Sequence, residues 1–276
     1  MGMLGEGSIR KMRVEASEPV EYFLPIGEGE VSVNALVGKQ VVLEYAGKIS
    51  CIHCGRNTRK SFAQGYCYPC FRDLAQCDSC IVKPEKCHFY EGTCREPEWA
   101  EKFCMQDHYV YLANSSGLKV GITRGNQIPT RWIDQGAIQA RPIARVSTRQ
   151  QSGFLEVALK ASLADKTNWR TMLRNLAEPL DMDAEAQRVL RDHQQDIENL
   201  QQQFGLQAIT ILEDAESVSF SYPVINYPEK VTSMNLEKQP RIAGRLMGIK
   251  GQYLMFDCGV INIRNFAGYS CRLESV

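Results

Sequence analysis

Nine of the eleven cysteines lie between Cys51 and Cys104, and their spacing constrains the fold more than any other feature of the sequence. The segment reads CIHC, twelve further residues, CYPC, six residues and CDSC, and Cys87 and Cys94 follow at intervals of six residues each. A CxxC pair places two thiolates on one tight turn, and two such pairs about a dozen residues apart supply four ligands for one tetrahedral ion. The spacing therefore predicts two structural zinc ions.

The order of the pairs favours sequential ligation, with one site completed before the next begins. An interleaved arrangement, in which the first and third pairs share an ion, would resemble a RING cross-brace, but that arrangement ends in a closely spaced ligand pair, and Cys87 and Cys94 are too far apart to fit well. His53, His88 and Cys104 are spare donors that we expect to pack beside the ions, and they leave the fourth ligand of the second site open. The predicted ligand sets are Cys51, Cys54, Cys67 and Cys70 for the first ion, and Cys77, Cys80, Cys87 and Cys94 for the second.

Other uses of the thiols require other surroundings. Disulfides form in oxidising compartments, whereas the N-terminal residues are polar without an apolar run, and no stretch approaches the ~18 apolar residues of a membrane span. We therefore expect a cytoplasmic protein with reduced thiols and no membrane contact. An iron–sulfur cluster on the second set remains an alternative. Cys258 and Cys271 are expected to be buried thiols.

The rest of the chain predicts an α+β protein. At 276 residues it has room for two or three small domains, and its net charge is zero, which argues against binding nucleic acid through bulk electrostatics. Charge is uneven locally: residues 105–160 carry seven Lys or Arg against three Asp or Glu, and residues 161–216 carry five against eleven. This pattern suggests a basic functional face beside an acidic helical cap, or simply an uneven solvated surface.

Hydrophobic periodicity places the main elements. Residues 18–47 and 252–264 alternate as strands, residues 108–124 read as two strands around an Asn-Ser-Ser-Gly turn, and residues 153–163 and 183–204 read as helices. Strands at the two chain ends are too few to be stable alone, so we expect them to pair into one small β-barrel. The predicted segments are N-terminal strands (1–50), a zinc segment (51–104), a central core (105–180), a helical cap (181–216) and C-terminal strands (217–276).

The central sequence HYVYLANSSGLKVGITRGNQIPTRWIDQGA resembles the core of the GIY-YIG nuclease superfamily. Val110-Tyr111-Leu112 stands where GIY would be, and Lys119-Val120-Gly121 stands where YIG would be. Arg131 matches the helix arginine of that core, and Glu156 is the candidate for its metal-binding glutamate. The resemblance implies a hairpin followed by helices, and a catalytic site of Tyr111, Lys119, Arg131 and Glu156.

One position departs from the signature, because Lys119 replaces the second tyrosine. By the resemblance, Glu156 would hold one Mg²⁺ or Mn²⁺, Arg131 would neutralise charge on the phosphate, Tyr111 would position the attacking water and Lys119 would contact phosphate. The cysteine pairs and the C-terminal GIKGQYL run resemble an uncharacterised bacterial family of zinc proteins.

The leading expectation for function is a zinc-stabilised nucleic-acid-processing protein with an endonuclease-like, metal-dependent phosphodiesterase site. The alternatives are a non-catalytic module that binds RNA or DNA, and an adaptor whose zinc knuckles contact a protein partner.

Overall fold

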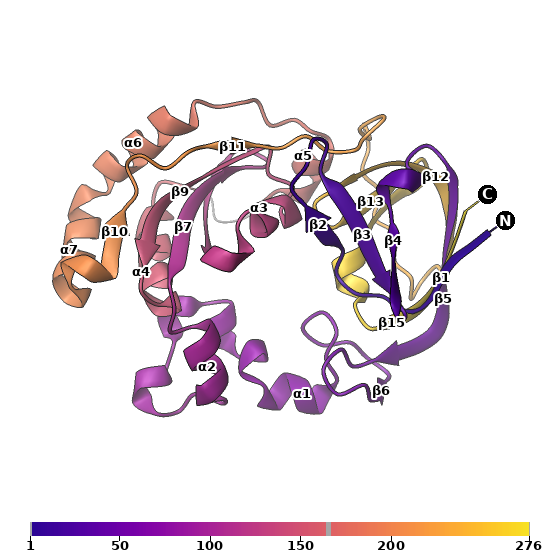
Figure 1. The fold of residues 1–276 in the computed structure, drawn as a ribbon, viewed down its shortest axis with the longest axis horizontal. Helices are drawn as coiled ribbons and strands as arrows, with labels where there is room; N and C mark the ends of the chain where they lie inside the picture. The colour runs from indigo at the N-terminus through magenta and orange to yellow at the C-terminus, as the bar shows by residue number, and fades with distance from the viewer. Residues whose placement is uncertain (1, 164–166, 276) are drawn as a thin grey trace.

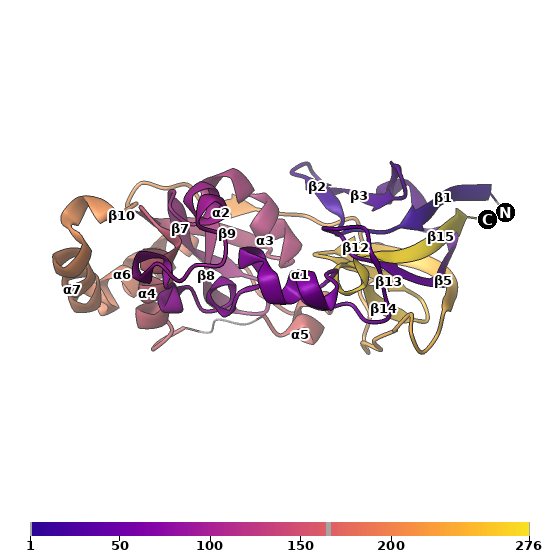
Figure 2. The same cartoon turned by 90° about the horizontal axis from the view of Figure 1, so that it is seen from below.

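The computed structural model describes residues 2–163 and 167–275, which form two β-sheet units (Figure 1). One unit carries both termini, and the other carries the helices α4, α6 and α7, whose bounds follow below. The cysteine-rich segment runs below the two units in this view, and the chain that includes β11 returns above them. Figure 2 shows the two units side by side along the long axis of the molecule.

The terminal unit is dominated by a seven-stranded sheet in the order β1-β15-β5-β12-β13-β14, with the short strand β6 paired to β5. β1 pairs antiparallel with β15, and β15 in turn pairs with β5, so the two ends of the chain share one sheet. The strands are β1 (Gly2–Ser8), β5 (Gln40–Ser50), β6 (Asn57–Thr58), β12 (Arg241–Lys250), β13 (Tyr253–Phe256), β14 (Gly259–Asn262) and β15 (Tyr269–Ser275).

This sheet corrects one expectation of the sequence. The predicted pairing of the chain ends is present, but the strand order begins at β1 and ends at β14, so the described residues form no closed barrel. A separate three-stranded sheet, β2 (Arg13–Glu15), β3 (Glu21–Ile26) and β4 (Gly29–Ser32), packs against it. The buried face of β3 carries Tyr22, Leu24 and Ile26, which pack in one core with Leu43 and Leu273. The apolar face of the larger sheet is therefore covered by a second sheet and not by closure into a barrel.

The second unit is a five-stranded sheet in the order β10-β9-β7-β8, with β11 also paired to β9. Its strands are β7 (His108–Asn114), β8 (Leu118–Arg124), β9 (Gln139–Val146), β10 (Ile209–Ile211) and β11 (Val218–Ser219). β7 and β8 form the predicted hairpin in full register from His108↔Arg124 to Asn114↔Leu118. The residues of β7 therefore face two different cores.

One of these cores lies under helices. Val110 and Leu112 pack with Leu155 of α4, Val189 of α6 and Ile197 of α7. On the other face Tyr111 and Ala113 pack with Trp132 of α3. The helices of the chain are α1 (Tyr68–Asp73), α2 (Pro97–Phe103), α3 (Thr130–Asp134), α4 (Arg149–Leu159), α5 (Trp169–Leu173), α6 (Met182–Asp192) and α7 (Gln194–Phe204). None of the helices within residues 2–163 and 167–275 has the length and apolarity that crossing a bilayer requires.

The long helix predicted for residues 183–204 is divided at His193 into α6 and α7. His193 is buried, and its Nε2 lies 2.6 Å from Ser162 Oγ while its Nδ1 lies 3.1 Å from Asp196 Oδ2. These contacts hold the imidazole where the chain changes direction. Periodicity continues across such a break, so the sequence pattern alone reads as one helix.

The two units are held together by α3. Ile133 of this helix lies in the core of the terminal unit, and Asp134 forms an ion pair with Lys11 and accepts a 2.9 Å hydrogen bond from Gln252. Gly251 adopts φ +62° beside the Asp134 carbonyl, where an added Cβ would lie 3.0 Å from that oxygen. The helix that carries Arg131 is thus fixed between both sheets.

Candidate functional site

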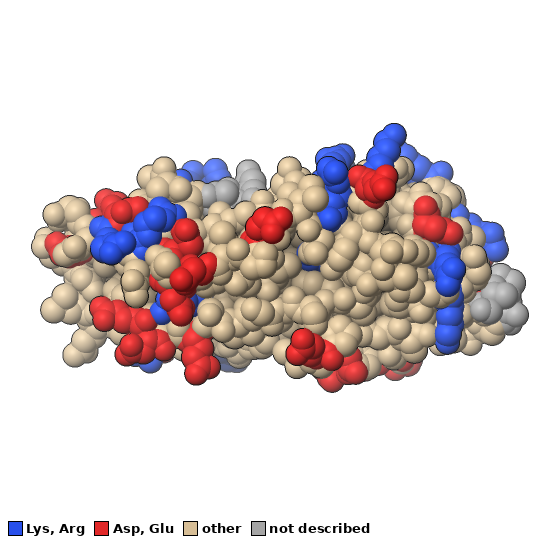
Figure 3. Space-filling model, turned by 90° about the horizontal axis from the view of Figure 1, so that it is seen from above, with Lys and Arg blue, Asp and Glu red and all other residues tan. Residues whose placement is uncertain are grey.

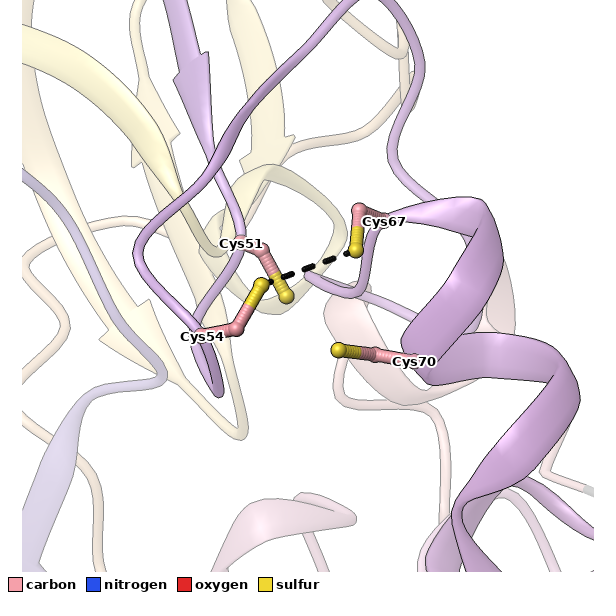
Figure 4. Close-up of side chains that lie close together, drawn as sticks. All are labelled: Cys51, Cys54, Cys67 and Cys70. Atoms are coloured by element: carbon pink, nitrogen blue, oxygen red, sulfur yellow. Dashed lines mark hydrogen bonds between the residues drawn. The ribbon is translucent and has the colours of Figure 1, made fainter.

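The four thiols of the first predicted zinc site converge in the structure. The sulfur atoms of Cys51, Cys54, Cys67 and Cys70 all lie within 4.8 Å of one another, and those of Cys54 and Cys67 are 3.7 Å apart (Figure 4). Cys51 and Cys67 are buried, whereas Cys54 is exposed. Four thiolates gathered in this way fit a closed tetrahedral zinc shell, which leaves no position for a substrate.

Local backbone geometry explains this convergence. Cys51 follows the end of β5, and the chain then turns at Gly55, whose φ of +70° favours glycine and whose N–H donates to the Cys51 carbonyl at 2.9 Å. On the other side Cys67 is the N-cap of α1, and Cys70 lies in its first turn. Each CxxC pair therefore lies on a short turn that backbone hydrogen bonds define.

Electrostatics distinguish the thiols of this site. Burial raises the pKa of Cys51, but backbone N–H groups of Cys54, Cys67 and His53 donate to its sulfur and lower the pKa to about 6 overall. Desolvation, followed by hydrogen bonding to the other three thiols, raises the pKa of Cys70. One thiolate is thus stabilised mainly by backbone N–H groups, and a cation in the centre of the set would stabilise further ionisation.

The second predicted set is not gathered in the same way. Among the described residues, the second compact group of possible ligands comprises Asp78, Cys80 and His88. Burial raises the pKa of Cys77 to about 11, and the thiol that raises it further is Cys51 of the first site. Cys77 belongs to neither compact group of possible ligands, although the spacing predicts it as a ligand of the second site.

Asp78 in this group is already engaged by the protein. Its Oδ1 accepts from the N–H of Cys80 at 3.4 Å, and its Oδ2 lies 2.7 Å from Arg95 Nε. His88 Nε2 is 3.6 Å from Asp78 Oδ2, and its Nδ1 lies 2.7 Å from Thr93 Oγ1. This arrangement satisfies both side chains without an ion, as expected for a capped and ion-paired loop.

Two of the four residues suggested by the nuclease resemblance meet at a glutamine that the sequence did not single out. Tyr111 Oη donates to Gln135 Oε1 at 3.2 Å, and Lys119 Nζ donates to the same oxygen. Tyr111 is fully buried and Lys119 is 4% exposed. Gly121 lies directly under the tyrosine, because an added Cβ would stand 2.7 Å from its Cζ and Oη.

Arg131 and Glu156 approach this network from α3 and α4. Burial raises the pKa of Tyr111, the nearby Arg131 opposes that shift, and the Glu156 carboxylate adds to it. Glu156 also forms a 3.3 Å ion pair with Lys160 one turn later on α4. No group of three His, Cys, Asp or Glu within residues 2–163 and 167–275 includes Glu156, so a divalent ion there would take further ligands from water or phosphate.

A cavity of about 500 Å³ lies between the terminal unit, the first cysteine site and α3. Ile52 and Tyr66 line it from the cysteine segment, and Thr130 lines it from α3. Its basic lining residues are Arg10, Lys11, Arg13 and Arg264. These come from the two ends of the chain, so they are not the residues of the predicted basic segment 105–160.

Not all of this positive charge is neutralised within the protein. Lys11 pairs with Asp134, and Arg13 pairs with Glu15 and Glu30. By contrast Arg10, Arg131 and Arg264 form no salt bridge with any described carboxylate; Arg264 Nε donates to Gln64 Oε1 at 2.7 Å. Burial and then the neighbouring Arg131 lower the pKa of Arg264, which places two guanidinium groups within electrostatic reach of each other.

Some acidic residues of the helical cap are paired with an arginine of the same helix. Arg188 on α6 pairs with Glu185 at 2.7 Å and with Asp192 at 3.1 Å. Figure 3 shows acidic and basic side chains interleaved at the end that carries these helices, and few charged side chains over the middle of that face. Ion pairs on the surface therefore offset part of the acidic excess of residues 161–216.

Cys271 is buried as expected, but the expectation for Cys258 is wrong, because its side chain is exposed after β13. Gln135, Arg264 and the basic residues of positions 10–13 escaped the sequence reasoning. The one signal for Gln135 was its place just after the α3 arginine. For Lys11 and Arg264 no signal existed, because the residues they meet, Asp134 and Arg131, lie more than a hundred residues away along the chain.

No curated protein and no solved structure matches this sequence. A family model described as "Protein of unknown function (DUF2797)" matches residues 38–271, which extend from the start of β5 into β15. The match takes in the whole cysteine segment, the five-stranded sheet and the seven-stranded sheet from β5 into β15, and it leaves out β1 and the three-stranded sheet. The chain belongs to this DUF2797 family of proteins of unknown function.

Proposed function

We propose that this chain is a zinc-stabilised nucleic-acid-processing protein that binds the phosphate backbone of a DNA or RNA strand in the basic cavity. The observation that carries the proposal is a cavity lined by Arg10 and Arg264, with Arg131 outside its lining but within electrostatic reach of Arg264. Guanidinium groups that repel each other are stabilised when a phosphate lies between them, and arginine binds phosphate in a bidentate manner.

The cavity walls suit a strand as well as a phosphate. Tyr66 supplies an aromatic surface on which a base can stack, and Ile52 supplies apolar contact. Both residues belong to the first cysteine site, since the Ile52 N–H donates to the Gly65 carbonyl at 2.9 Å. Zinc would therefore shape one wall of the binding site while remaining outside the chemistry.

Binding of labelled single-stranded DNA and RNA oligonucleotides, followed by fluorescence anisotropy over a range of salt concentrations, tests this proposal. We expect Arg264→Ala to weaken binding about tenfold and to reduce the salt dependence by about one phosphate contact. Arg241→Ala, at an exposed position on β12 outside the cavity, is the matched control and should bind as wild type does. Absence of binding at low salt would contradict the proposal and leave the protein adaptor as the surviving function.

A second candidate, phosphodiester hydrolysis, is favoured by one further observation. Arg131 lies beside both Arg264 at the cavity and Tyr111 in the buried network, and Glu156 is within electrostatic reach of the same tyrosine. Glu156 would hold Mg²⁺ or Mn²⁺ and Arg131 would neutralise developing charge on the phosphate. Because Tyr111 is fully buried, we assign it to orienting Gln135, and not to positioning the attacking water.

Glu156→Gln tests hydrolysis, because it keeps the volume of the side chain and removes its charge. We expect cleavage dependent on Mg²⁺ or Mn²⁺ to be lost while oligonucleotide affinity is retained. Glu185→Gln is the matched control, since Glu185 is also a half-buried helical glutamate paired with a basic residue of its own helix. If the wild-type protein cleaves neither DNA nor RNA with either ion, the hydrolytic function is wrong and the binding function stands by itself.

A further inference from the structure

A serine, a histidine and an aspartate are hydrogen-bonded in series where the chain leaving α4 meets the break between α6 and α7. Ser162 Oγ lies 2.6 Å from His193 Nε2, and His193 Nδ1 lies 3.1 Å from Asp196 Oδ2. A carboxylate only accepts hydrogen bonds, so the ring proton of the neutral imidazole lies on Nδ1. Nε2 is then left to accept the proton of the Ser162 hydroxyl, which is the arrangement that activates a serine nucleophile.

The exposure of these side chains suits a nucleophile and its base. Ser162 is exposed, whereas His193 is 6% exposed. The backbone holds the histidine on both sides: its N–H donates to the Val189 carbonyl at 3.1 Å, and its carbonyl accepts from the Ile197 N–H at 3.0 Å. Val189 and Ile197 both lie in the core under the five-stranded sheet. The imidazole is therefore fixed against this core, and the serine hydroxyl remains accessible to a substrate.

Ser162 also lines a cavity of about 490 Å³ beside the turn of the β7–β8 hairpin. A volume of this size accommodates a small organic molecule. One part of the lining is apolar and consists of Leu118, Leu163, Leu176, Ala177 and Leu180. Arg188 and Glu185 line it from α6, but they pair with each other at 2.7 Å. The apolar residues therefore favour an uncharged, apolar group next to the serine.

A buried acceptor without a partner lies at the same cavity. Asn114 lines the cavity and is fully buried, and its Nδ2 donates to the Glu178 carbonyl at 2.7 Å and to Gln139 Oε1 at 3.3 Å. Its Oδ1 is also buried, yet no described residue donates to it. Buried polar atoms are nearly always paired, so an unpaired acceptor beside a cavity indicates a ligand that donates a hydrogen bond.

We propose that Ser162 and His193 are the catalytic residues of a separate esterase site, whose substrate is a small carboxylic ester with an apolar acyl group and an N–H donor. Ser162 Oγ attacks the carbonyl carbon, and its proton passes to His193 Nε2. The C–O bond to the alcohol then breaks, and the leaving oxygen takes the proton from Nε2. Water attacks the acyl-serine in the same way and gives a proton to Nε2. The acid leaves, and Ser162 Oγ recovers that proton.

Asp196 acts through the imidazole and is a positioning residue. Its carboxylate holds the ring in the tautomer that leaves Nε2 unprotonated, and it stabilises the charged ring that forms during the attack. The inference is independent of nucleic-acid binding, because this cavity shares no lining residue with the basic cavity.

Hydrolysis of p-nitrophenyl butyrate and labelling by an alkyl fluorophosphonate test the assignment. The fluorophosphonate forms a P–O bond to an activated serine as fluoride leaves, so mass spectrometry identifies the residue that carries the adduct. We expect one adduct, on Ser162, and we expect Ser162→Ala to lower kcat/KM about 10³-fold or more. Ser221→Ala, at an exposed serine outside the cavity, is the matched control and should react as the wild type does.

Three outcomes would overturn the proposal: no hydrolysis and no adduct in the wild type, an adduct on another serine, or hydrolysis that Ser162→Ala leaves unchanged. The last outcome would arise if the ester only acylated exposed thiols or amines, which this substitution does not touch.

Asp196→Asn tests the positioning role, because it keeps the shape of the side chain and removes its charge. It should lower kcat about tenfold and leave KM unchanged, since the carboxylate stabilises the transition state without contacting substrate. An effect on folding alone would not separate kcat from KM in this way. An unchanged kcat would overturn the role given to Asp196.

The contribution of Asn114 Oδ1 is tested through the substrate. The p-nitrophenyl ester of N-acetylalanine carries an amide N–H, and the ester of N-acetyl-N-methylalanine lacks it. We expect kcat/KM to be about tenfold higher for the first ester, because only its N–H can pair with the buried acceptor. Equal values would overturn the assignment of a substrate with an N–H donor.

Discussion

The Cys51 site and the network around Gln135 are both clusters of side chains that the sequence marked as functional, yet the chain builds them in different ways. The cysteine site needs only two short turns, one after β5 and one at the start of α1. The network needs a hairpin, the end of α3 and the glycine under Tyr111 to come together. The first is complete within twenty residues of chain, and the second depends on the whole sheet.

This difference decides how much each cluster relies on a ligand. Four thiolates gathered within 4.8 Å of one another repel each other, so a bound cation would stabilise the cysteine site. In the network, Gln135 Oε1 already accepts from both Tyr111 and Lys119. Polar groups that satisfy one another in this way stabilise the fold with no ligand present.

The largest effect should follow from removing a ligand of the first site. Cys67→Ser should release one metal equivalent and destabilise residues 51–70 by on the order of 5–10 kcal/mol, because metal binding is folding free energy in such modules. Zinc content and hydrogen exchange of that segment measure the result. Cys258→Ser, at an exposed thiol, is the control and should change stability by less than about 0.5 kcal/mol. A Cys67→Ser protein with full metal content would show that the two clusters do not differ in this respect.

A smaller effect should follow from crowding the network. Gly121→Ala places a methyl group 2.7 Å from Tyr111 Cζ and Oη, and overpacking of this kind destabilises by about 1–3 kcal/mol. Urea unfolding measures the change. Gly29→Ala in β4 is the control, because nothing lies within 4 Å of its added Cβ.

The same substitution can be tested for its cause. In a Tyr111→Leu background the shorter side chain leaves room for the methyl group, so the penalty of Gly121→Ala should largely disappear. Such non-additivity is expected for residues in direct contact. Equal penalties in both backgrounds would place the strain elsewhere and would weaken the view that Gly121 exists to accommodate the tyrosine.

The comparison also explains what the sequence could predict. The two cysteines of a CxxC pair are three residues apart, so local backbone geometry alone brings their thiols together. The first ligand set could therefore be predicted from the sequence. The hairpin of β7 and β8 was readable for the same reason, because period-two alternation and a polar turn are local signals. Cys77 follows the same local rule, yet the described residues do not gather it with a compact set of ligands.

Features that depend on contacts between residues far apart in the sequence could not be predicted from it. Arg264 and Arg131 are separated by more than a hundred residues, and no periodicity relates them. The small β-barrel failed as a prediction for a related reason: strand alternation predicts one buried face, and either closure or a second sheet can cover that face. The break at His193 depends on Ser162, which lies on the chain that follows α4.

The smallest effect concerns His108, which lies on β7 with Tyr111. It tests whether the polar groups of this strand, like those of the network, are satisfied within the protein. His108 is fully buried, its Nδ1 lies 2.8 Å from the Gln106 carbonyl, and burial lowers its pKa from 6.5 to about 4. His108 is therefore protonated below about pH 6.5 in the unfolded chain, but only below about pH 4 in the folded chain. Stability from this group is fully present above pH 6.5 and is lost as the pH falls toward 4, by about 1 kcal/mol between pH 7 and pH 5.5.

His108→Gln removes the titrating group, so the variant should lose about 1 kcal/mol less than the wild type over this interval, whatever its stability at pH 7. Urea unfolding at both pH values, with saturating zinc to hold the cysteine sites constant, measures the difference. An identical pH slope in the two proteins would mean that His108 is protonated in the fold and that its Nε2 finds a partner.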